Sequence, residues 1–251
     1  LGDVYKRQIQ NGNPMRPAAA LKAGSYRYAR YYARFYRSLL RLHGISMCIF
    51  PEGTRNDNPK ELLPFDFETY FNSEINCQIV TTNCLTGKAE YMTEDSDNDR
   101  LMKLCRASSS MPLLTPIVNI DNVPYLDGGL ADSVPIRRAQ QMENEKIVVI
   151  LTKNQGYRKS VLSPTMQRVY KRAYKSYPNL IRTIFRRSFE YNKTMNYLDQ
   201  LEKRGEIFIL RPQVKPVSRL ERNKETLHAF YEHGYKYTER KFDDLMEYLE
   251  K

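Results

Sequence analysis

The sequence predicts an α/β fold, a three-layer sandwich with a mainly parallel central sheet that is incomplete at its N-terminal side. The clearest strand is residues 146–152 (KIVVILT), a continuous β-branched run of the kind that is buried on both faces of a parallel sheet. Segments with helical periodicity separate this run from other short apolar runs. The composition, 41% hydrophobic and 27% charged in 251 residues, excludes a disordered or coiled-coil protein.

Predicted helices and strands alternate in the first half of the chain. Residues 25–42 carry apolar side chains at spacings of four and three beside a stripe of arginines, which predicts an amphipathic helix with a basic flank. Residues 45–50 predict a buried strand, and residues 60–76 a loop with a short helix. Residues 78–82 and 89–92 predict two strands joined by an L-T-G-K hairpin turn.

The second half of the chain contains more helix. A helix is predicted over residues 101–108, and four carboxylates are expected to form its solvated start: Glu94, Asp95, Asp97 and Asp99. Two or three basic helices are predicted over residues 163–204. A strand over residues 207–210 and a helix over residues 224–250 complete the chain.

The net charge of +11 is concentrated in two segments. Residues 16–41 carry seven basic and no acidic residues, and residues 157–204 carry twelve basic against three acidic residues. The rest of the chain is slightly acidic, so the pattern indicates two basic faces rather than a uniformly basic protein. Such faces suit anionic lipid head groups as well as phosphodiesters.

Four cysteines occur at positions 48, 77, 84 and 105, with no C-x-x-C pair and no histidine at ligand spacing. We therefore expect buried thiols and neither a disulfide framework nor a metal site. The longest apolar stretches are far shorter than the roughly 18 residues that span a bilayer, and no signal-peptide pattern is evident. These observations predict a cytoplasmic location, with peripheral attachment to a membrane as the alternative.

Residues 125–130 (YLDGGL) place a carboxylate, Asp127, at the end of a short predicted strand, followed by two glycines that are free to take positive φ. Residues 107–116 (ASSSMPLLTP) precede this motif, and residues 134–139 (VPIRRA) follow it. Together these blocks resemble the patatin-like phospholipase family from about Pro64 to the C terminus. Three further matches are similar to its bacterial branch: Arg211-Pro212, Arg219-Leu220-Glu221 and Gly234-Tyr235.

The resemblance implies a lipid ester hydrolase that uses a serine in a G-x-S-x-G turn and the aspartate of D-G-G. Asp127 would be the base of this Ser-Asp dyad, and Gly128 and Gly129 would hold its loop. The sequence contains no G-x-S-x-G; the nearest segment, residues 44–48, places Ser46 inside an apolar run rather than at a strand-to-helix turn. The Gly-rich oxyanion segment of the family is also missing, so we expect the chain as given to be inactive as an esterase.

A second resemblance covers residues 9–58. Residues 50–55 (FPEGTR) match the F-P-E-G-T-R block of lysophosphatidic-acid acyltransferases, in which the glutamate and arginine help to hold a phosphate. The corresponding candidate phosphate-binding residues are Glu52, Gly53, Thr54 and Arg55. The catalytic H-x-x-x-x-D of that family is absent, because no aspartate stands five residues after any of the three histidines.

Residues 3–8 (DVYKRQ) look like the in-frame translation of a sequencing-adaptor end. The predicted organisation is therefore residues 1–8 as an adaptor artefact, residues 9–63 as an acyltransferase-like fragment or a helix-strand extension, and residues 64–251 as the patatin-like α/β portion with a basic helical C-terminal region. The simplest account is a chimeric sequence joined near Pro64, each piece without its nucleophile or base partner.

The leading functional hypothesis is a portion of a patatin-like serine lipid acyl hydrolase that carries Asp127. The implied partner is a phospholipid or another acyl ester, with a peripheral anionic membrane surface as a further partner, no cofactor, no metal and no nucleic acid. One alternative is a glycerophospholipid acyltransferase fragment that uses residues 52–55. The other is a non-enzymatic basic module that binds lipid or nucleic acid through residues 27–41, where tyrosines could stack on bases.

Overall fold

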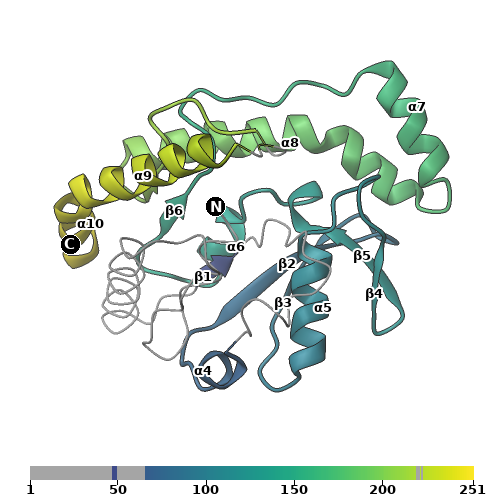
Figure 1. Cartoon of the computed structure of the whole chain (residues 1–251), viewed down its shortest axis with the longest axis horizontal. Helices are drawn as coiled ribbons and strands as arrows, with labels where there is room; N and C mark the ends of the chain where they lie inside the picture. The colour runs from purple at the N-terminus through teal and green to yellow at the C-terminus, as the bar shows by residue number, and fades with distance from the viewer. Residues whose placement is uncertain (1–46, 50–65, 219–220, 222) are drawn as a thin grey trace. The chain divides into compact units, whose positions relative to one another are not determined.

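The computed structural model describes residues 47–49, 66–218, 221 and 223–251 (Figure 1). The chain divides into two compact units. In the described part, the N-terminal unit comprises residues 47–49, 66–133 and 163–185, and the C-terminal unit comprises residues 134–162 and 186–251, with the gaps noted above. The motif that contains Asp127 lies in the N-terminal unit.

The N-terminal unit is built on a five-stranded sheet: β1 (Met47–Ile49), β2 (Cys77–Asn83), β3 (Ala89–Met92), β4 (Val118–Ile120) and β5 (Val123–Asp127). The longest of these strands, β2, lies at the centre. Ile79 pairs with both β1 and β3, and Thr81 pairs with both β3 and β5. Therefore β3 occupies one edge of β2, and β1 and β5 share the other edge.

The expected α/β class is confirmed, but this sheet is mixed rather than mainly parallel. Only the β1–β2 pairing is parallel in its described strands; β2 pairs antiparallel with β3 and β5, and β4 pairs antiparallel with β5. Tight turns account for two of the antiparallel pairings, β2–β3 and β4–β5, because a short hairpin loop imposes antiparallel pairing. The predicted L-T-G-K turn joins β2 to β3 with Gly87 at φ +69°, and Asp121 and Asn122 join β4 to β5 at φ 51° and 63°.

The helices of this unit are α4 (Phe67–Phe71), α5 (Asn98–Ser108), α7 (Pro164–Ala173) and the first part of α8 (Pro178–Lys203). Leu101, Leu104 and Ala107 of α5 are buried against the sheet in a core that includes Ile79 and Val118. The helix begins a little before the predicted residue 101, because the Asp97 side chain accepts the Arg100 N–H and caps it.

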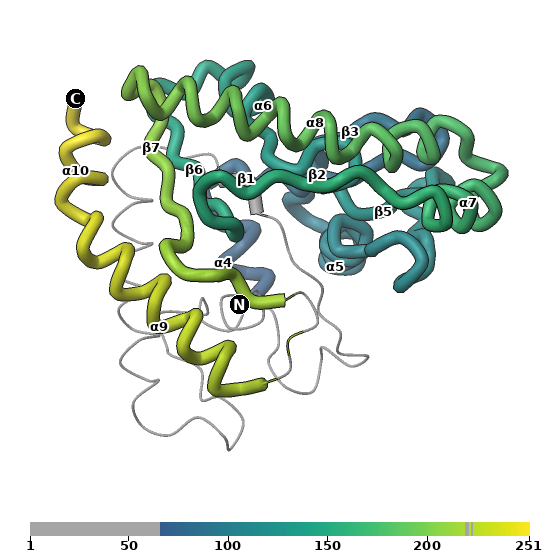
Figure 2. The backbone as a smooth tube through the Cα atoms, turned by 90° about the horizontal axis from the view of Figure 1, so that it is seen from above, coloured from purple at the N-terminus to yellow at the C-terminus, as the bar shows by residue number. Residues whose placement is uncertain are grey.

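The C-terminal unit contains β6 (Val148–Ile150) and β7 (Phe208–Leu210), which pair in parallel. Its helices are α6 (Ile136–Gln141), the rest of α8, α9 (Lys224–Arg240) and α10 (Phe242–Glu250). Figure 2 shows β6 and β7 side by side and the last two helices running consecutively to the C terminus. The predicted strand over 146–152 is confirmed as β6, but it is not covered on both faces, since Val149 is buried and Ile150 is 68% exposed.

None of the helices in the described residues combines the length and the apolar character needed to cross a membrane.

Candidate functional site

Asp127 is the last residue of β5 and caps the short 3-10 helix η1 (Gly128–Leu130). Its Oδ1 atom accepts the backbone N–H of Gly129 at 2.7 Å. The side chain is half-buried, whereas the three residues that follow it are buried. The carboxylate is therefore held at a strand end in a defined orientation and retains contact with the surface.

Three hydrogen bonds hold the main chain around Asp127 in place. Its N–H donates to the carbonyl oxygen of Ser110 at 2.9 Å. The hydroxyl of Thr82 donates to the carbonyl oxygen of Asp127 at 2.8 Å, and the N–H of Ala131 donates to the same hydroxyl at 3.3 Å. Because Thr82 has no exposed surface, this hydroxyl is a rigid link between β2 and the turn that follows Asp127.

Gly128 is required by the close approach of two backbones. A Cβ atom at this position would lie 2.2 Å from the carbonyl oxygen of Val80 on β2. The sequence indicated that both glycines of D-G-G are free to take positive φ, but neither Gly128 nor Gly129 is among the residues with positive φ. The glycine after the aspartate thus allows the turn that follows β5 to lie directly against the backbone of β2.

A polar chain lies along the sheet next to the motif. Glu90 on β3 accepts two hydrogen bonds of 2.7 Å, one from the side-chain amide of Asn83 and one from the hydroxyl of Tyr125. Burial, followed by the hydrogen bond to Glu90, raises the pKa of Tyr125. Nearby, the hydroxyl of Tyr91 donates to Asp132 at 2.6 Å. These bonds tie Tyr125, the first residue of the Y-L-D-G-G-L segment, and Asp132, which follows the segment, to β3.

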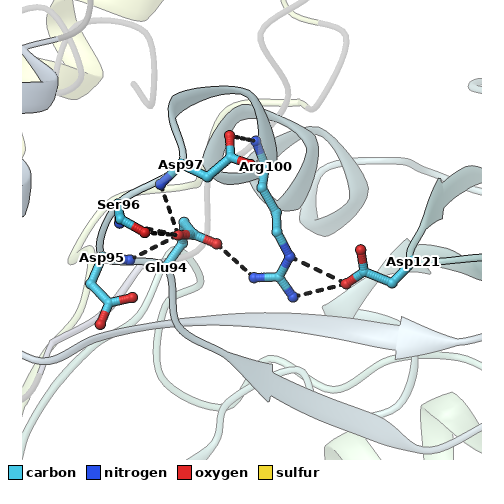
Figure 3. A network of polar contacts seen from close by, with 6 residues as sticks. All are labelled: Glu94, Asp95, Ser96, Asp97, Arg100 and Asp121. Atoms are coloured by element: carbon cyan, nitrogen blue, oxygen red, sulfur yellow. Dashed lines mark hydrogen bonds and ion pairs between the residues drawn. The ribbon is translucent and has the colours of Figure 1, made fainter.

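The turn at the other end of β5 is held by an ion-pair network (Figure 3). Arg100 on α5 donates to Glu94 at 2.7 Å and to Asp121, in the β4–β5 turn, at 3.1 and 3.2 Å. Glu94 Oε1 also accepts the backbone N–H groups of the three residues that follow it. The expectation that Glu94 is solvated is wrong, because the loop folds around its carboxylate and leaves the side chain 7% exposed. The exposed Asp97 and Asp99 do form the helix start.

The other sequence-predicted site residues lie outside the described part of the chain. This applies to the candidate phosphate-binding residues Glu52, Gly53, Thr54 and Arg55. Ser46, which the sequence does not place at a nucleophile turn, and the predicted basic helix over 25–42 also lie outside it. Of the cysteines, Cys84 is buried as expected, and Cys77 and Cys105 are half-buried.

No group of three or more His, Cys, Asp or Glu residues that could hold a metal ion occurs in the described parts of the chain. Two serines of the A-S-S-S segment before Asp127 are buried. Ser110 is 3% exposed and its hydroxyl donates to the carbonyl oxygen of Arg106, while Ser108 is 4% exposed. Within the described residues, the site thus presents one positioned carboxylate rather than a complete nucleophile-base pair.

Sequence reasoning did not identify Thr82, Val80 or the carbonyl group of Ser110 as supports of the site. Thr82 and Val80 lie in the predicted strand over 78–82, where nothing in the sequence distinguishes a supporting side chain from a core side chain. The A-S-S-S segment belongs to the sequence motif, but no sequence signal predicts that the Ser110 carbonyl group accepts the N–H of Asp127.

Two family models match the chain. One, described as "Patatin-like phospholipase", matches residues 8–139, and the other, "Domain of unknown function (DUF6363)", matches residues 177–250. No curated protein matches the sequence. The first match includes β2 to β5 and the whole Asp127 motif, and it starts well before residue 64. The matches lend no support to the acyltransferase and nucleic-acid-binding alternatives, which stay predictions, as does the adaptor origin of residues 3–8.

Proposed function

We propose, because this chain belongs to the patatin-like phospholipase family, that it contributes the base of a Ser-Asp dyad to a lipid acyl hydrolase. The family acts on lipid acyl esters, so a lipid ester is the substrate class. Asp127 is the proposed base, and Gly128 and Gly129 are the proposed supports of its loop. The serine would come from a G-x-S-x-G turn, which this sequence does not contain.

The observation that carries this proposal is the fixed position of the Asp127 carboxylate. It is bonded to the Gly129 N–H, and its own backbone is held by Ser110 and Thr82. A base must lie within hydrogen-bonding distance of the proton that it accepts, and rigid support reduces the cost of reaching that geometry. The Asp127 carboxylate has this rigid support at the end of a strand. Because it is half-buried, it also remains accessible to a hydroxyl.

In the proposed reaction, Asp127 accepts the proton of the serine hydroxyl as the serine oxygen attacks the ester carbonyl. The tetrahedral intermediate collapses to an acyl-serine, and the leaving alcohol takes the proton from Asp127. Water then attacks the acyl-serine, with Asp127 again accepting the proton, and this proton returns to the serine oxygen as the fatty acid is released. The steps balance without a metal or a cofactor.

Attraction to an anionic membrane surface forms a second part of the proposal. Residues 157–204 carry twelve basic against three acidic residues. Each lysine or arginine near an anionic surface contributes on the order of 1 kcal/mol, so a few suffice for binding that weakens with salt. The protein would then meet its substrate at a membrane surface.

A fluorophosphonate probe, which labels activated serines, tests the dyad. We expect no labelling of the present chain and clear labelling of a version that also carries a G-x-S-x-G segment from another member of the family. In that version Asp127→Ala should abolish labelling, because the serine loses its base. The matched control is Asp132→Asn, a nearby carboxylate bonded to Tyr91, which should retain labelling. Stoichiometric labelling of the present chain, or equal loss with both variants, would refute the assignment.

A further inference from the structure

Two loops of the N-terminal unit expose leucine side chains. Leu85, in the β2–β3 turn, is 52% exposed, and Leu113 and Leu114, after α5, are 40% and 67% exposed. A single exposed leucine is common on soluble proteins and requires no explanation. Three that gather at one place are a candidate contact surface.

These two loops converge on the segment that joins α7 to α8. The N–H of Leu113 donates to the hydroxyl of Tyr174 at 2.9 Å, and Tyr174 also lies close enough to Cys84 for the thiol to contribute to its raised pKa, of which burial is the main cause. Asn179 at the start of α8 donates to the carbonyl oxygen of Leu85 at 2.9 Å. The three leucines therefore flank one helix-helix junction.

The backbone of Leu113 is strained. Its φ of 68° lies in the left-handed region, which is unfavourable for a residue with a side chain. Burial of its side chain does not compensate, since the leucine is 40% exposed. Strained residues cluster at functional sites, so an exposed leucine in this conformation is a candidate contact residue.

The charge around the leucines has one sign. Residues 84–88, 110–117 and 163–185 contain six lysines and arginines and no aspartate or glutamate. Four of them, at spacings of three, one and three, form a stripe along α7 and the residues after it: Arg168, Lys171, Arg172 and Lys175. All four are exposed. The surface thus combines apolar tips with a basic helix.

The same loop leads directly to the candidate catalytic residue. Ser110, three residues before Leu113, accepts the N–H of Asp127 through its carbonyl oxygen. A surface that binds the Leu113 loop is therefore close, along a short and hydrogen-bonded path, to the carboxylate. This connection is what a hydrolase of membrane lipids needs.

We propose that Leu85, Leu113 and Leu114, together with the basic stripe of α7, form a docking surface for an anionic lipid bilayer. The inference rests on the proposed function and names the face that meets the membrane. The leucines enter the head-group region, and the stripe binds acidic head groups. Lipid fits better than nucleic acid, because leucine cannot stack on bases.

The absence of tryptophan from the sequence allows a direct test with the present chain. Leu114→Trp adds a single reporter at the proposed insertion point. Anionic vesicles, in which about 30 mol% of the phosphatidylcholine is replaced by phosphatidylserine, should shift the tryptophan emission to the blue. Lipids brominated on the acyl chain should quench this emission. The matched control is Glu68→Trp on α4, which lies away from α7 in the same unit (Figure 1) and should show neither effect.

Affinity measurements complete the test. Replacing the four residues of the stripe with glutamine should weaken binding to these vesicles by on the order of a hundredfold or more at low salt. Leu113→Ser with Leu114→Ser should weaken it by about tenfold to a hundredfold. Leu113→Gly should raise the Tm, because glycine relieves the backbone strain, and should lower the affinity for vesicles. A leucine with a purely structural role would not raise stability and lower vesicle affinity in the same variant.

Three results would overturn the docking surface: equal quenching at positions 68 and 114, a shift at position 114 caused by RNA but not by vesicles, or a shift that depends on protein concentration without lipid. None of these measurements requires hydrolysis. Failure of the fluorophosphonate experiment would therefore refute the dyad and leave the docking surface standing. Failure of the vesicle experiments would refute the docking surface and leave the dyad standing.

Discussion

The carboxylate of Glu94 lies 2.7 Å from the guanidinium of Arg100, and only 7% of the Glu94 side chain is exposed. The hydrogen bond from Arg100, followed by that from the Asp97 N–H, lowers the pKa of Glu94 from 4.5 to about 2. The pair anchors the loop before α5, and Arg100 extends the anchor to Asp121 in the turn that precedes β5.

Glu94 should make stability depend on acid pH. Because its folded pKa is lowered, its contribution is complete above the unfolded value near 4.5 and is lost as the pH falls toward 2. Glu94→Gln should therefore reduce the free energy of unfolding by about 2 kcal/mol at pH 7 and by much less at pH 2. Urea denaturation at several pH values measures this. The exposed neighbour Asp95→Asn should change stability by less than about 0.5 kcal/mol; equal losses at pH 7 and pH 2 for Glu94→Gln would contradict the assignment.

Two adjacent threonines on β2 should respond in opposite directions to the same substitution. Thr82→Val removes a hydroxyl that bonds the backbone at Asp127 and Ala131, and we expect a loss of about 1–3 kcal/mol. Thr81 is equally buried, but its Oγ1 has no hydrogen-bond partner among the described residues. Thr81→Val should be neutral or stabilising, because it removes a polar atom that is buried without a partner. Thermal unfolding of both variants tests the pair, and a similar loss in both would show that the hydroxyl of Thr82 does not hold the turn.

Two glycines offer a similar contrast. Gly128→Ala places a Cβ atom 2.2 Å from the Val80 carbonyl oxygen, so β2 and β5 must separate, at a cost of about 3 kcal/mol or more. Gly234 lies inside α9, and a Cβ atom there would meet nothing within 4 Å. Gly234→Ala should stabilise the protein by about 0.5–1 kcal/mol through helix propensity. Chemical denaturation measures both changes. A Gly128→Ala variant as stable as the wild type would refute the close approach of the two backbones.

In the C-terminal unit, the hydroxyl of Tyr248 on α10 lies 3.0 Å from the N–H of Ile147 and 3.1 Å from the carbonyl oxygen of Glu206. Tyr248→Phe should destabilise this unit by about 1–2 kcal/mol, because it removes an acceptor from a backbone N–H next to β6. Amide hydrogen exchange at Ile147 should accelerate. Tyr237→Phe on α9, where the ring stacks on His233, serves as the control and should leave this exchange unchanged. Unaltered exchange in Tyr248→Phe would show that α10 does not protect β6.

The sequence by itself determined the elements whose signal is local. The α/β class, the hairpin turn at Gly87, the strand over 146–152 and the position of Asp127 at a strand end all follow from patterns within a few residues, and the structure confirms them. The family was also recognisable from the spacing of the A-S-S-S and D-G-G blocks, since such a motif is read along the chain.

Only the tertiary structure decided what depends on contacts between distant segments. The antiparallel pairing of β2 with β5 brings Thr82 beside Asp127, 45 residues away, and explains why Gly128 must be glycine. The burial of Glu94 depends in the same way on Arg100 and on the loop that encloses it. Spacing along the chain reports which face of an element a residue occupies, but not which strand or loop covers that face, because pairing is chosen by the packing of the whole unit.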